Sequence, residues 1–460
     1  MNKDPLPERE VIIKRDLTKG NIIRNIWHLA FPLIIGNVLL GTFEMVDMAF
    51  VGRLGPSAVA AVSLSGAITG IIWIAIMGIS TGTVAMVARF IGAKEFERAN
   101  NVATQSLLIS LSGGVITAVA GFFFAQSILK AMGARGEVLS LGTSYFRIIC
   151  FGALAVFPSV TLAFALRGAG DALTPTKVLI FSTGLNIILD PLFIFGIGYF
   201  PQMGVAGSAI ATVIARSVEM FILLVIFLKG KSHLHIDLKT LKIEPGLIWK
   251  IMKIGIFVSI TELMWNISSL ILMRIVAFYG TFAIAAYGIG IRLMLAVQMP
   301  GFALAQSAAT LVGQNLGANK PERAEKSAWL SLGFYEIMMI VLTGIIFLFT
   351  PRVVAVFNTN PEVIKIGVSY LKFMAVTFVF MALSITLAGA MQGAGDSFSP
   401  MVIDGITLFA VRIPLVIILA NTLELGVIGI WTGIAISNII EGLCMSFRFS
   451  QGKWKYKIIS

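Results

Sequence analysis

Four oxygen-bearing side chains lie inside long apolar stretches of the chain: Asp47, Asn186, Asp190 and Thr212. Asn186 and Asp190 are four residues apart, so on a helix they project from the same face. Two carboxylates that converge in a medium of low dielectric repel each other, and a shared proton or small cation would stabilise them. Carboxylate, amide and hydroxyl oxygens suit a proton relay and Na⁺ equally. We therefore expect a cation- or proton-coupling site, although each aspartate could instead be a buried structural acid.

A second group of charged and aromatic residues occupies the apolar stretches of the C-terminal half: Glu262, Tyr287, Arg292, Asp404 and Arg412. These side chains could line a substrate cavity. Asp404 and Arg412 are two helical turns apart and could equally neutralise each other as a structural pair. We expect the remaining intramembrane acids, among them Glu219, Glu336 and Glu441, to pair with opposite charges or to reach the membrane surface.

The elements that must position these residues are membrane-spanning helices. Of the 460 residues, 57% are hydrophobic and only 13% are charged, whereas a soluble domain devotes about a quarter of its residues to charge. The net charge of +12 does not indicate nucleic-acid binding, because the basic residues lie in short loops. Stretches long enough to cross the hydrocarbon core of a bilayer occur about twelve times, near residues 25–50, 58–88, 102–128, 138–165, 175–198, 205–228, 249–277, 283–313, 326–350, 362–391, 398–420 and 427–448.

Alternate loops differ in their content of Lys and Arg, which accumulate on the cytoplasmic side of a membrane protein. The basic set comprises Lys14, Arg15, Lys19, Arg24, Lys94, Arg98, Lys229, Lys231, Lys239, Lys242, Lys320, Arg323, Lys326, Lys453, Lys455 and Lys457. The opposite set has little beyond Arg53, Lys130, Arg135 and Arg352. Both termini are therefore expected in the cytoplasm, and the absence of a cleavable signal peptide and the compact basic loops favour a prokaryotic inner membrane.

The two halves of the chain repeat each other at a constant offset of 225 residues, as from Gly92 to Gly317. The same offset relates Gly168-Ala-Gly-Asp171 to Gly393-Ala-Gly-Asp396. Six spans form an even number, so both copies enter from the same side and the repeat is parallel. The expected fold is an all-α membrane protein with two six-helix lobes. We expect a cytoplasmic N-terminal segment (1–24), an N-lobe (25–228), a basic linker (229–247), a C-lobe (248–449) and a cytoplasmic tail (450–460).

The acids of the first group are not part of this repeat. At the offset of 225 residues, Asp47 corresponds to Leu272, Asn186 to Val411 and Asp190 to Leu415. Gly, Pro and Arg positions that are repeated in both halves indicate the shared scaffold. Acids that occur in only one half indicate function. We infer that the N-lobe carries the ion coupling.

Several other kinds of chemistry lack their residues. His28, His233 and His235 are too few and wrongly spaced for a zinc site, and no Gly-x-x-x-x-Gly-Lys phosphate loop occurs. The Gly168-Ala-Gly-Asp171 motif has the form found in intramembrane aspartyl proteases, but its loop position and its repetition favour a turn. Small-residue pairs, Gly66 with Gly70 and Gly78 with Gly82, are expected to form helix-packing seams. We therefore expect no enzyme activity, no cofactor and no nucleotide.

Taken together, several motifs resemble those of the multidrug and toxic compound extrusion (MATE) transporters over essentially the whole chain. They are Pro32, Asp47 leading into Val51-Gly-Arg-Leu-Gly55, the Gly92-Ala93 loop, Leu166-Arg-Gly-Ala-Gly-Asp171 and Asn186-Ile-Ile-Leu-Asp190-Pro191. The acid at Asp190 resembles the prokaryotic DinF-like branch. The resemblance implies twelve-helix antiporters that export cationic or amphipathic compounds in exchange for inward H⁺ or Na⁺.

The resemblance also assigns roles to residues. Asp47 would be the principal protonation or cation site, completed by Asn186, Asp190 and Thr212, with any bound Na⁺ held by these four residues. Pro32 would be the point where the first span bends, and Tyr145 resembles a cavity residue near the cluster. We expect cation binding to expel the substrate by alternating access of the two lobes, in a protein that works as a monomer.

Three alternatives stay open at this stage. A flippase for lipid-linked oligosaccharides, from the same superfamily, would want a strongly cationic central cavity. An intramembrane enzyme would need a catalytic pair or metal ligands, and a receptor or scaffold that transports nothing would not need Asp47, Asn186 and Asp190 inside the bilayer.

Overall fold

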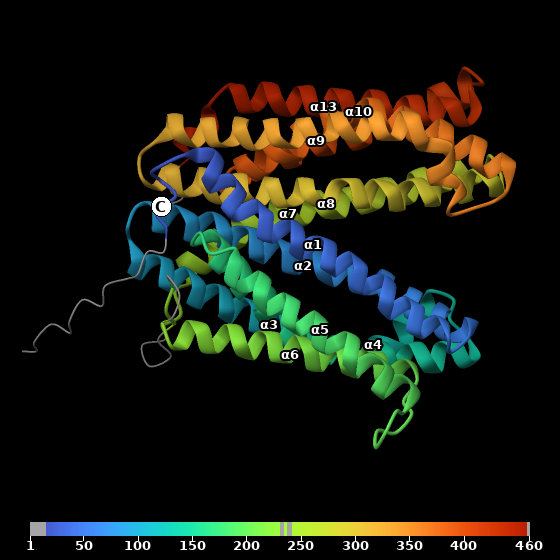
Figure 1. The fold of residues 1–460 in the computed structure, drawn as a ribbon, viewed down its shortest axis with the longest axis horizontal. Helices are drawn as coiled ribbons and strands as arrows, with labels where there is room; N and C mark the ends of the chain where they lie inside the picture. The colour runs from blue at the N-terminus through green and yellow to red at the C-terminus, as the bar shows by residue number, and fades with distance from the viewer. Residues whose placement is uncertain (1–14, 231–233, 237–241, 458–460) are drawn as a thin grey trace, which may run out of the picture.

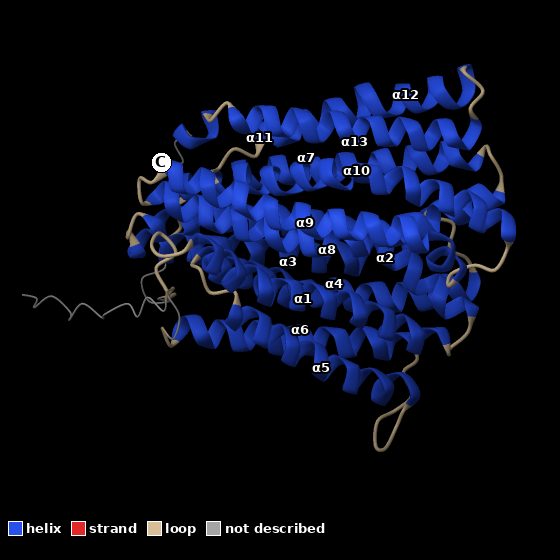
Figure 2. Cartoon of the chain, turned by 45° about the horizontal axis from the view of Figure 1, so that its top comes forward, coloured by secondary structure: helices blue, strands red, loops and turns tan. Residues whose placement is uncertain are grey.

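The computed structural model describes residues 15–230, 234–236 and 242–457. Within these ranges the chain is helical, with short loops and no strand (Figure 2). Twelve helical spans in this part of the chain are long and apolar enough to cross a membrane. They are α1 (Ile22–Gly52), α2 (Pro56–Gly92), α3 (Phe96–Ala131), α4 (Gly136–Gly168), α5 (Leu173–Phe195), α6 (Val205–Leu228), α7 (Pro245–Ala277), α8 (Thr281–Gly317), α9 (Pro321–Ala355), α10 (Pro361–Gly393), an eleventh span Phe398–Thr422 and α13 (Gly426–Ser450).

The spans form two lobes built in the same way (Figure 1). In the N-lobe, α4 packs against α2, α3 and α6, and in the C-lobe α10 packs against α8, α9 and α13. The helix ends repeat as well: α2 begins at Pro56 and ends at Gly92, and α8 begins at Thr281 and ends at Gly317. The structure therefore confirms the internal repeat expected from the sequence.

The repeat extends to the backbone conformation of the turns. Lys94 and Asn319, which correspond at the offset of 225 residues, both have positive φ angles, of 62° and 56°. Gly170 and Gly395 correspond in the same way, with φ angles of 93° and 85° that favour glycine. The two Gly-Ala-Gly-Asp motifs are therefore turns, each at the end of a long helix. The Asp171 carboxylate accepts bonds from the Thr174 amide (2.9 Å) and hydroxyl (2.6 Å), which fixes the start of α5.

The eleventh span is the irregular member of the repeat. It consists of α11 (Phe398–Gly405), a π-helical segment Ile406–Arg412, α12 (Ile413–Ile417) and a second π-helical segment Ile418–Thr422. The wide turns are seen in i→i+5 bonds such as that from the Ile413 amide to the Leu408 carbonyl. Pro414 lacks the amide that a regular helix would need at this point. π turns are rare and are frequent at functional sites.

The lobes meet at the end of the bundle that carries the described ends of the chain, which we call the closed end. Residues of α2 are largely buried from Ile76 to Gly92, whereas none is buried between residues 66 and 75. The corresponding helix α8 shows the same contrast, with burial concentrated after Gly301. The lobes therefore contact each other along the closed-end halves of these helices and leave the other halves, toward the open end, more exposed.

A crossing of α2 and α7 brings the lobes into backbone contact. A Cβ atom built on Gly78 would lie 2.7 Å from the Gly255 carbonyl oxygen, and one on Gly82 would collide with Ile251. The pair Gly78 and Gly82 therefore forms the expected packing seam. Nothing lies within 4 Å of a Cβ built on Gly66 or Gly70, so that part of the expectation is wrong.

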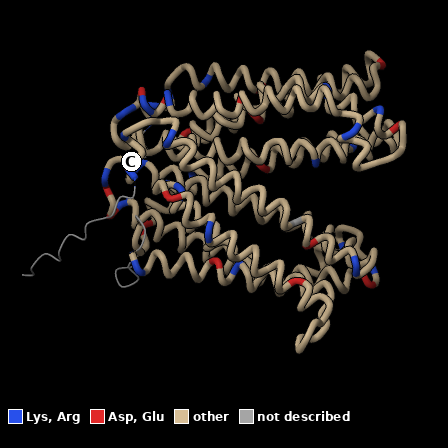
Figure 3. Tube along the Cα trace, in the orientation of Figure 1, with Lys and Arg blue, Asp and Glu red and all other residues tan. Residues whose placement is uncertain are grey.

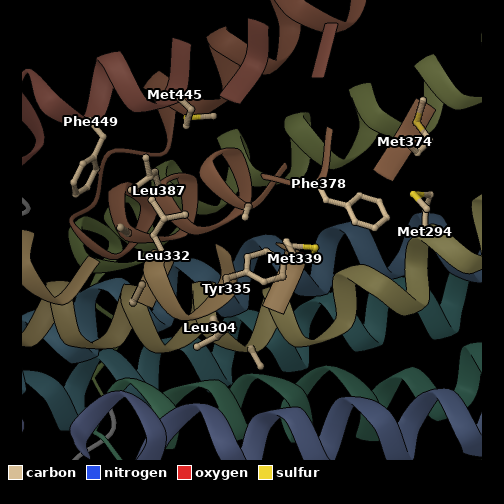
Figure 4. Close-up of a cluster of buried hydrophobic side chains, with 14 of the residues drawn as sticks. Met294, Leu304, Leu332, Tyr335, Met339, Met374, Phe378, Leu387, Met445 and Phe449 are labelled. Carbon is tan, nitrogen blue, oxygen red and sulfur yellow. The ribbon is translucent and has the colours of Figure 1, made fainter. Parts of the chain in front are cut away.

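Helix α1 belongs to both lobes. Its first half, including Ile26, Leu29 and Leu33, is part of the large apolar core of the C-lobe. Figure 4 shows residues of this core, among them Tyr335 and Phe378. The second half of α1 packs along α5, and the Asn37 amide donates to the Met299 carbonyl in α8 (3.1 Å). Any movement between the lobes must therefore bend or displace α1.

Most Lys and Arg lie toward the closed end (Figure 3), which agrees with the loop pattern of the sequence. Lys14, Lys231 and Lys239 lie outside the described residues, as do parts of the predicted terminal segments and linker. The cytoplasmic orientation of this end stays a prediction.

Candidate functional site

Asp47 lies in the last third of α1, five residues before its end, and meets the first turn of α6. The Ser208 hydroxyl of α6 donates to Asp47 Oδ1 at 2.7 Å. Ser208 is fully buried, whereas Asp47 is partly exposed. The carboxylate is thus held by a neutral donor and keeps access to its surroundings, as a group that exchanges a proton or cation requires.

Asp190 and Asn186 lie one turn apart on α5, as the sequence predicts. Asp190 is fully buried and Asn186 is 3% exposed. The Asn186 amide lies 3.5 Å from Asp190 Oδ1, at the long limit of a hydrogen bond, and Asp190 Oδ2 and Asn186 Oδ1 have no hydrogen-bond partner in the described part of the chain. A structural acid would be fully bonded. This pair keeps free lone pairs that a proton or cation can use.

The two carboxylates belong to one electrostatic unit. Asp47 and Asp190 lie close enough for their charges to repel, and both charges act on Tyr145 of α4. Tyr145 packs beside Val51 and Leu54 at the open end of α1. The structure thus brings together residues of α1, α4, α5 and α6 that are far apart in the sequence.

Thr212 contributes to a small cavity rather than to a direct bond. With Ser182, Thr183, Asn186 and Arg216 it lines a space of about 10 Å³, roughly what one water molecule needs. The cavity lies on the closed-end side of Asp190, since α5 and α6 run in opposite directions. The polar residues that line this cavity extend the site by about one helical turn from Asp190 toward the closed end.

A buried ion pair lies at the closed-end side of these polar residues. Arg216 and Glu219 of α6 are 2.8 Å apart, and the Ser182 hydroxyl donates to Glu219 Oε2 at 3.0 Å. Glu219 therefore has the pairing role predicted for it. Because its charge is already balanced, Glu219 is distinct from the unpaired Asp47 and Asp190.

Ser208 is the site residue that the sequence interpretation missed. It precedes Thr212 by four residues and so lies on the same face of α6. That spacing was the available signal, but a serine in an apolar helix usually bonds its own backbone. Only the packing of α6 against α1 shows that this serine reaches an acid.

In the C-lobe, Arg412 pairs with Glu441 of α13 (3.4 Å), which confirms that Glu441 pairs, and the charge of Asp404 also acts on Arg412. Asp404, Arg412 and Tyr287 are 5%, 3% and 3% exposed, so they line no open cavity in this conformation. Tyr287 stacks on Trp431. Glu262 lies exposed in the middle of α7.

Two further candidates have only partial support from their surroundings. Pro32 lies inside the continuous helix α1, and the Thr176 hydroxyl donates to its carbonyl (3.3 Å). Glu336 in α9 has a buried Oε2 atom without a hydrogen-bond partner among the described residues, so pairing, one of the two roles expected for it, is not seen. Among the described residues, no group of three or more His, Cys, Asp or Glu could hold a metal ion.

Comparison with known proteins places these features in context. The family model described as MatE matches twice, over residues 32–192 and 258–418, once in each lobe. The chain is 29% identical over 458 residues to the probable multidrug resistance protein YoeA of Bacillus subtilis (strain 168), covering 98% of both chains.

Two solved structures share the fold. A MATE protein in a bent conformation superimposes with a TM-score of 0.89 at 25% identity, over 97% of this chain and 98% of the other. A MOP superfamily transporter from Pyrococcus furiosus gives the same score and identity, over 96% of this chain and 98% of the other. The latter is described as having a binding pocket of reverse polarity that suggests a different function.

Proposed function

This chain belongs to the MatE family, and from that premise we propose that it is a secondary active antiporter. It exports cationic or amphipathic small molecules in exchange for inward H⁺ or Na⁺, without a cofactor. The proposal rests chiefly on one observation: Asp47 and Asp190, absent from the second repeat, form a single electrostatic unit with free oxygen atoms in the N-lobe. The multidrug resistance relative supports the substrate class.

The conformation fits one step of an alternating-access cycle. With the termini in the cytoplasm, the closed end is the cytoplasmic end, and this structure is outward-facing. An external cation then reaches partly exposed Asp47 first, and Asp190 with Asn186 and Thr212 forms the deeper part of the site. The protein acts as a monomer in a prokaryotic cell membrane, because one chain supplies both lobes.

Ion and substrate compete through charge and through α1. Ionised Asp47 and Asp190 attract a cationic substrate, and neutralising them removes that attraction. Since α1 packs on both lobes, a change in its packing beside Asp47 also favours one arrangement of the lobes. The two ligands therefore oppose each other thermodynamically even where their sites do not overlap. Pro32 supplies a weak point at which α1 can bend.

The test is efflux of a fluorescent cation, ethidium, from proteoliposomes under an imposed pH or Na⁺ gradient. Asp47→Asn and Asp190→Asn should each abolish gradient-driven efflux. The matched control is Glu137→Gln, which removes an exposed carboxylate from the open end of the same lobe and should leave efflux unchanged. Full coupled efflux by Asp47→Asn would overturn the assignment. The gradient that drives efflux names the ion.

The similarity to the Pyrococcus furiosus protein gives reason to keep one second candidate, a flippase for lipid-linked oligosaccharides. A flippase of this kind is expected to move the lipid-linked sugar and not to export ethidium under either gradient. Absence of efflux under both gradients, with translocation of a lipid-linked sugar in the same vesicles, would favour it.

A further inference from the structure

Asp404 is a buried acid that the N-lobe mechanism does not use. It lies at the end of α11, is 5% exposed, and its Oδ1 atom is buried without a hydrogen-bond partner. A carboxylate in this situation is costly unless it is paired or holds a proton. What surrounds it therefore decides its state.

The nearby guanidinium is already engaged by other groups. Arg412 Nε donates to the Ser437 hydroxyl (2.8 Å), and Nη2 donates to Asn438 Oδ1 (2.7 Å) and Glu441 Oε2 (3.4 Å). Its planar group also lies over the Trp265 ring, 4.7 Å from the centroid. Among the described residues no hydrogen bond or ion pair joins Arg412 directly to Asp404, and the carboxylate bonded to Arg412 is that of Glu441.

The charge balance of the cluster leaves one acid in excess. The charged groups that act on Asp404 are Glu441 from α13, Arg412 from the π-helical segment and Glu262 from α7. Tyr287 of α8 and Tyr370 of α10 also interact electrostatically with Arg412. One guanidinium thus faces two buried carboxylates, and because a metal cation would be repelled by Arg412, a proton is the ligand that fits Asp404.

A route to Asp404 and a way to transmit its state are both present. Glu262 is exposed in the middle of α7 and lies close enough for its charge to act on Asp404, so it is the exposed acid from which a proton can move inward. The π-helical segment runs from Ile406, two residues after Asp404, to Arg412. A π-helical turn contains about one residue more than an α-helical turn. If the segment changed to a regular α-helix, Arg412 would rotate by about 100° relative to Asp404. The proton on Asp404 and the conformation of the span are therefore linked.

We propose that Asp404 is a second proton-binding site, in the C-lobe, loaded through Glu262 once per transport cycle in addition to the N-lobe site. The transport part rests on the proposed antiport. In the ion-loaded state Asp404 is a neutral acid, and its release of the proton accompanies a change in the π-helical segment.

The first experiment measures the ratio of protons taken up to ethidium exported in proteoliposomes under a pH gradient, with an entrapped pH indicator. Asp404→Asn should lower this ratio by about half while efflux persists, and Asp404→Glu, which keeps a carboxyl group, should restore it. Glu137→Gln is the control with the wild-type ratio. An unchanged ratio in Asp404→Asn would overturn the proposal.

The second experiment does not depend on transport. Infrared difference spectra between acidic and alkaline pH record the C=O stretch of protonated carboxylic acids in the purified full-length protein. Asp404→Asn should lose one component of this band and Asp404→Glu should shift it, whereas a band identical to wild type would overturn the proposal. If wild type exports no ethidium under any gradient, the antiport proposal fails, and this spectrum still decides whether Asp404 binds a proton.

Discussion

At the scale of single residues, the two N-lobe acids differ in what holds them. Asp47 is partly exposed and has one hydroxyl donor, whereas Asp190 is fully buried with a free oxygen. In the proposed antiport, a cation arriving from the open end would therefore meet Asp47 first, and Ser208 would stabilise that carboxylate while it is ionised. The deeper Asp190 then shares the charge.

Ser208→Ala tests this arrangement. A hydrogen bond to a charged group contributes about 1.5–3 kcal/mol, so its loss should slow coupled ethidium efflux by about tenfold or more. The control is Ser217→Ala in the same helix, because the Ser217 hydroxyl donates to the Val213 carbonyl of its own helix (2.7 Å). Equal efflux by the two variants would mean that Ser208 does not support Asp47.

The buried pair of the C-lobe makes a prediction about stability. Arg412→Met leaves Glu441 without its counter-charge in the protein interior, which should cost about 3–5 kcal/mol. The double variant Arg412→Met with Glu441→Gln removes both charges and should recover most of that loss. Thermal unfolding in detergent micelles measures both, and a double variant no more stable than the single one would argue against the pair.

At the scale of helices, the crossing of α2 and α7 determines how closely the lobes approach. Gly78 and Gly255 allow backbone contact there, and α1 provides the second connection through Asn37. At the first crossing the backbones of Gly78 and Gly255 meet, and the Ser259 hydroxyl of α7 donates to the Ile74 carbonyl of α2 (3.0 Å). The second includes a helix weakened at Pro32.

Gly78→Ala should therefore disfavour this conformation. Its methyl group meets the Gly255 carbonyl, and overpacking of this kind costs about 1–3 kcal/mol, enough to shift the ratio of conformations about tenfold. The measurement is the distance between spin labels at Met132→Cys and Phe357→Cys, on equivalent open-end loops of the two lobes, with Cys150 and Cys444 replaced. Gly70→Ala, with nothing within 4 Å of its Cβ, is the control and should leave the distance distribution unchanged.

At the scale of the whole molecule, the fold was largely predictable because it depends on properties that a sequence displays directly. Hydropathy gave the spans, and the repeat of Gly92 in Gly317 gave the lobes. The π-helical segments were not predictable, since Pro414 alone predicts a kink and not a wide turn. The pairing of Arg412 with Glu441 was also missed, because it joins two spans whose relative rotation depends on packing.

The N-lobe site was predictable to the extent that its residues are unusual for a membrane. Asp47 and Asp190 attract notice as acids in apolar stretches, and Asn186 follows from its spacing. Ser208 is an ordinary residue in a transmembrane helix, and its role depends on a contact between α1 and α6. The sequence therefore identifies the acids whose burial in a membrane costs free energy. The structure is needed to identify the groups that stabilise those acids.

The segment before α1 joins the lobes at the closed end. Leu17 is buried in the apolar core that α1 shares with the C-lobe, and its side chain also lies against Gly170 of the N-lobe. The Lys320 ammonium donates to the Thr18 carbonyl (2.9 Å), and Arg323 donates to the carbonyls of Lys19 and Gly20 (both 2.8 Å). Partial burial opposes ionisation of Asp16, but the hydrogen bonds from Thr18 outweigh this effect and lower the pKa of Asp16. Asp16 is therefore ionised at neutral pH, and its hydrogen bonds with Thr18 are kept.

These contacts should favour the closed end over its opening. Lys320→Gln with Arg323→Gln removes charged donors that are partly solvent-exposed, so we expect a loss of about 1–2 kcal/mol for the pair. That loss would raise the population of the opposite conformation several-fold, seen as a shorter distance between the labels at Met132→Cys and Phe357→Cys. Lys326→Gln, at an exposed lysine on the same helix, is the control for loss of a positive charge at this end. If both variants give the wild-type distance distribution, the segment before α1 does not hold the lobes together, and the contacts of α2 with α7 and α8 and of α1 with α8 do so.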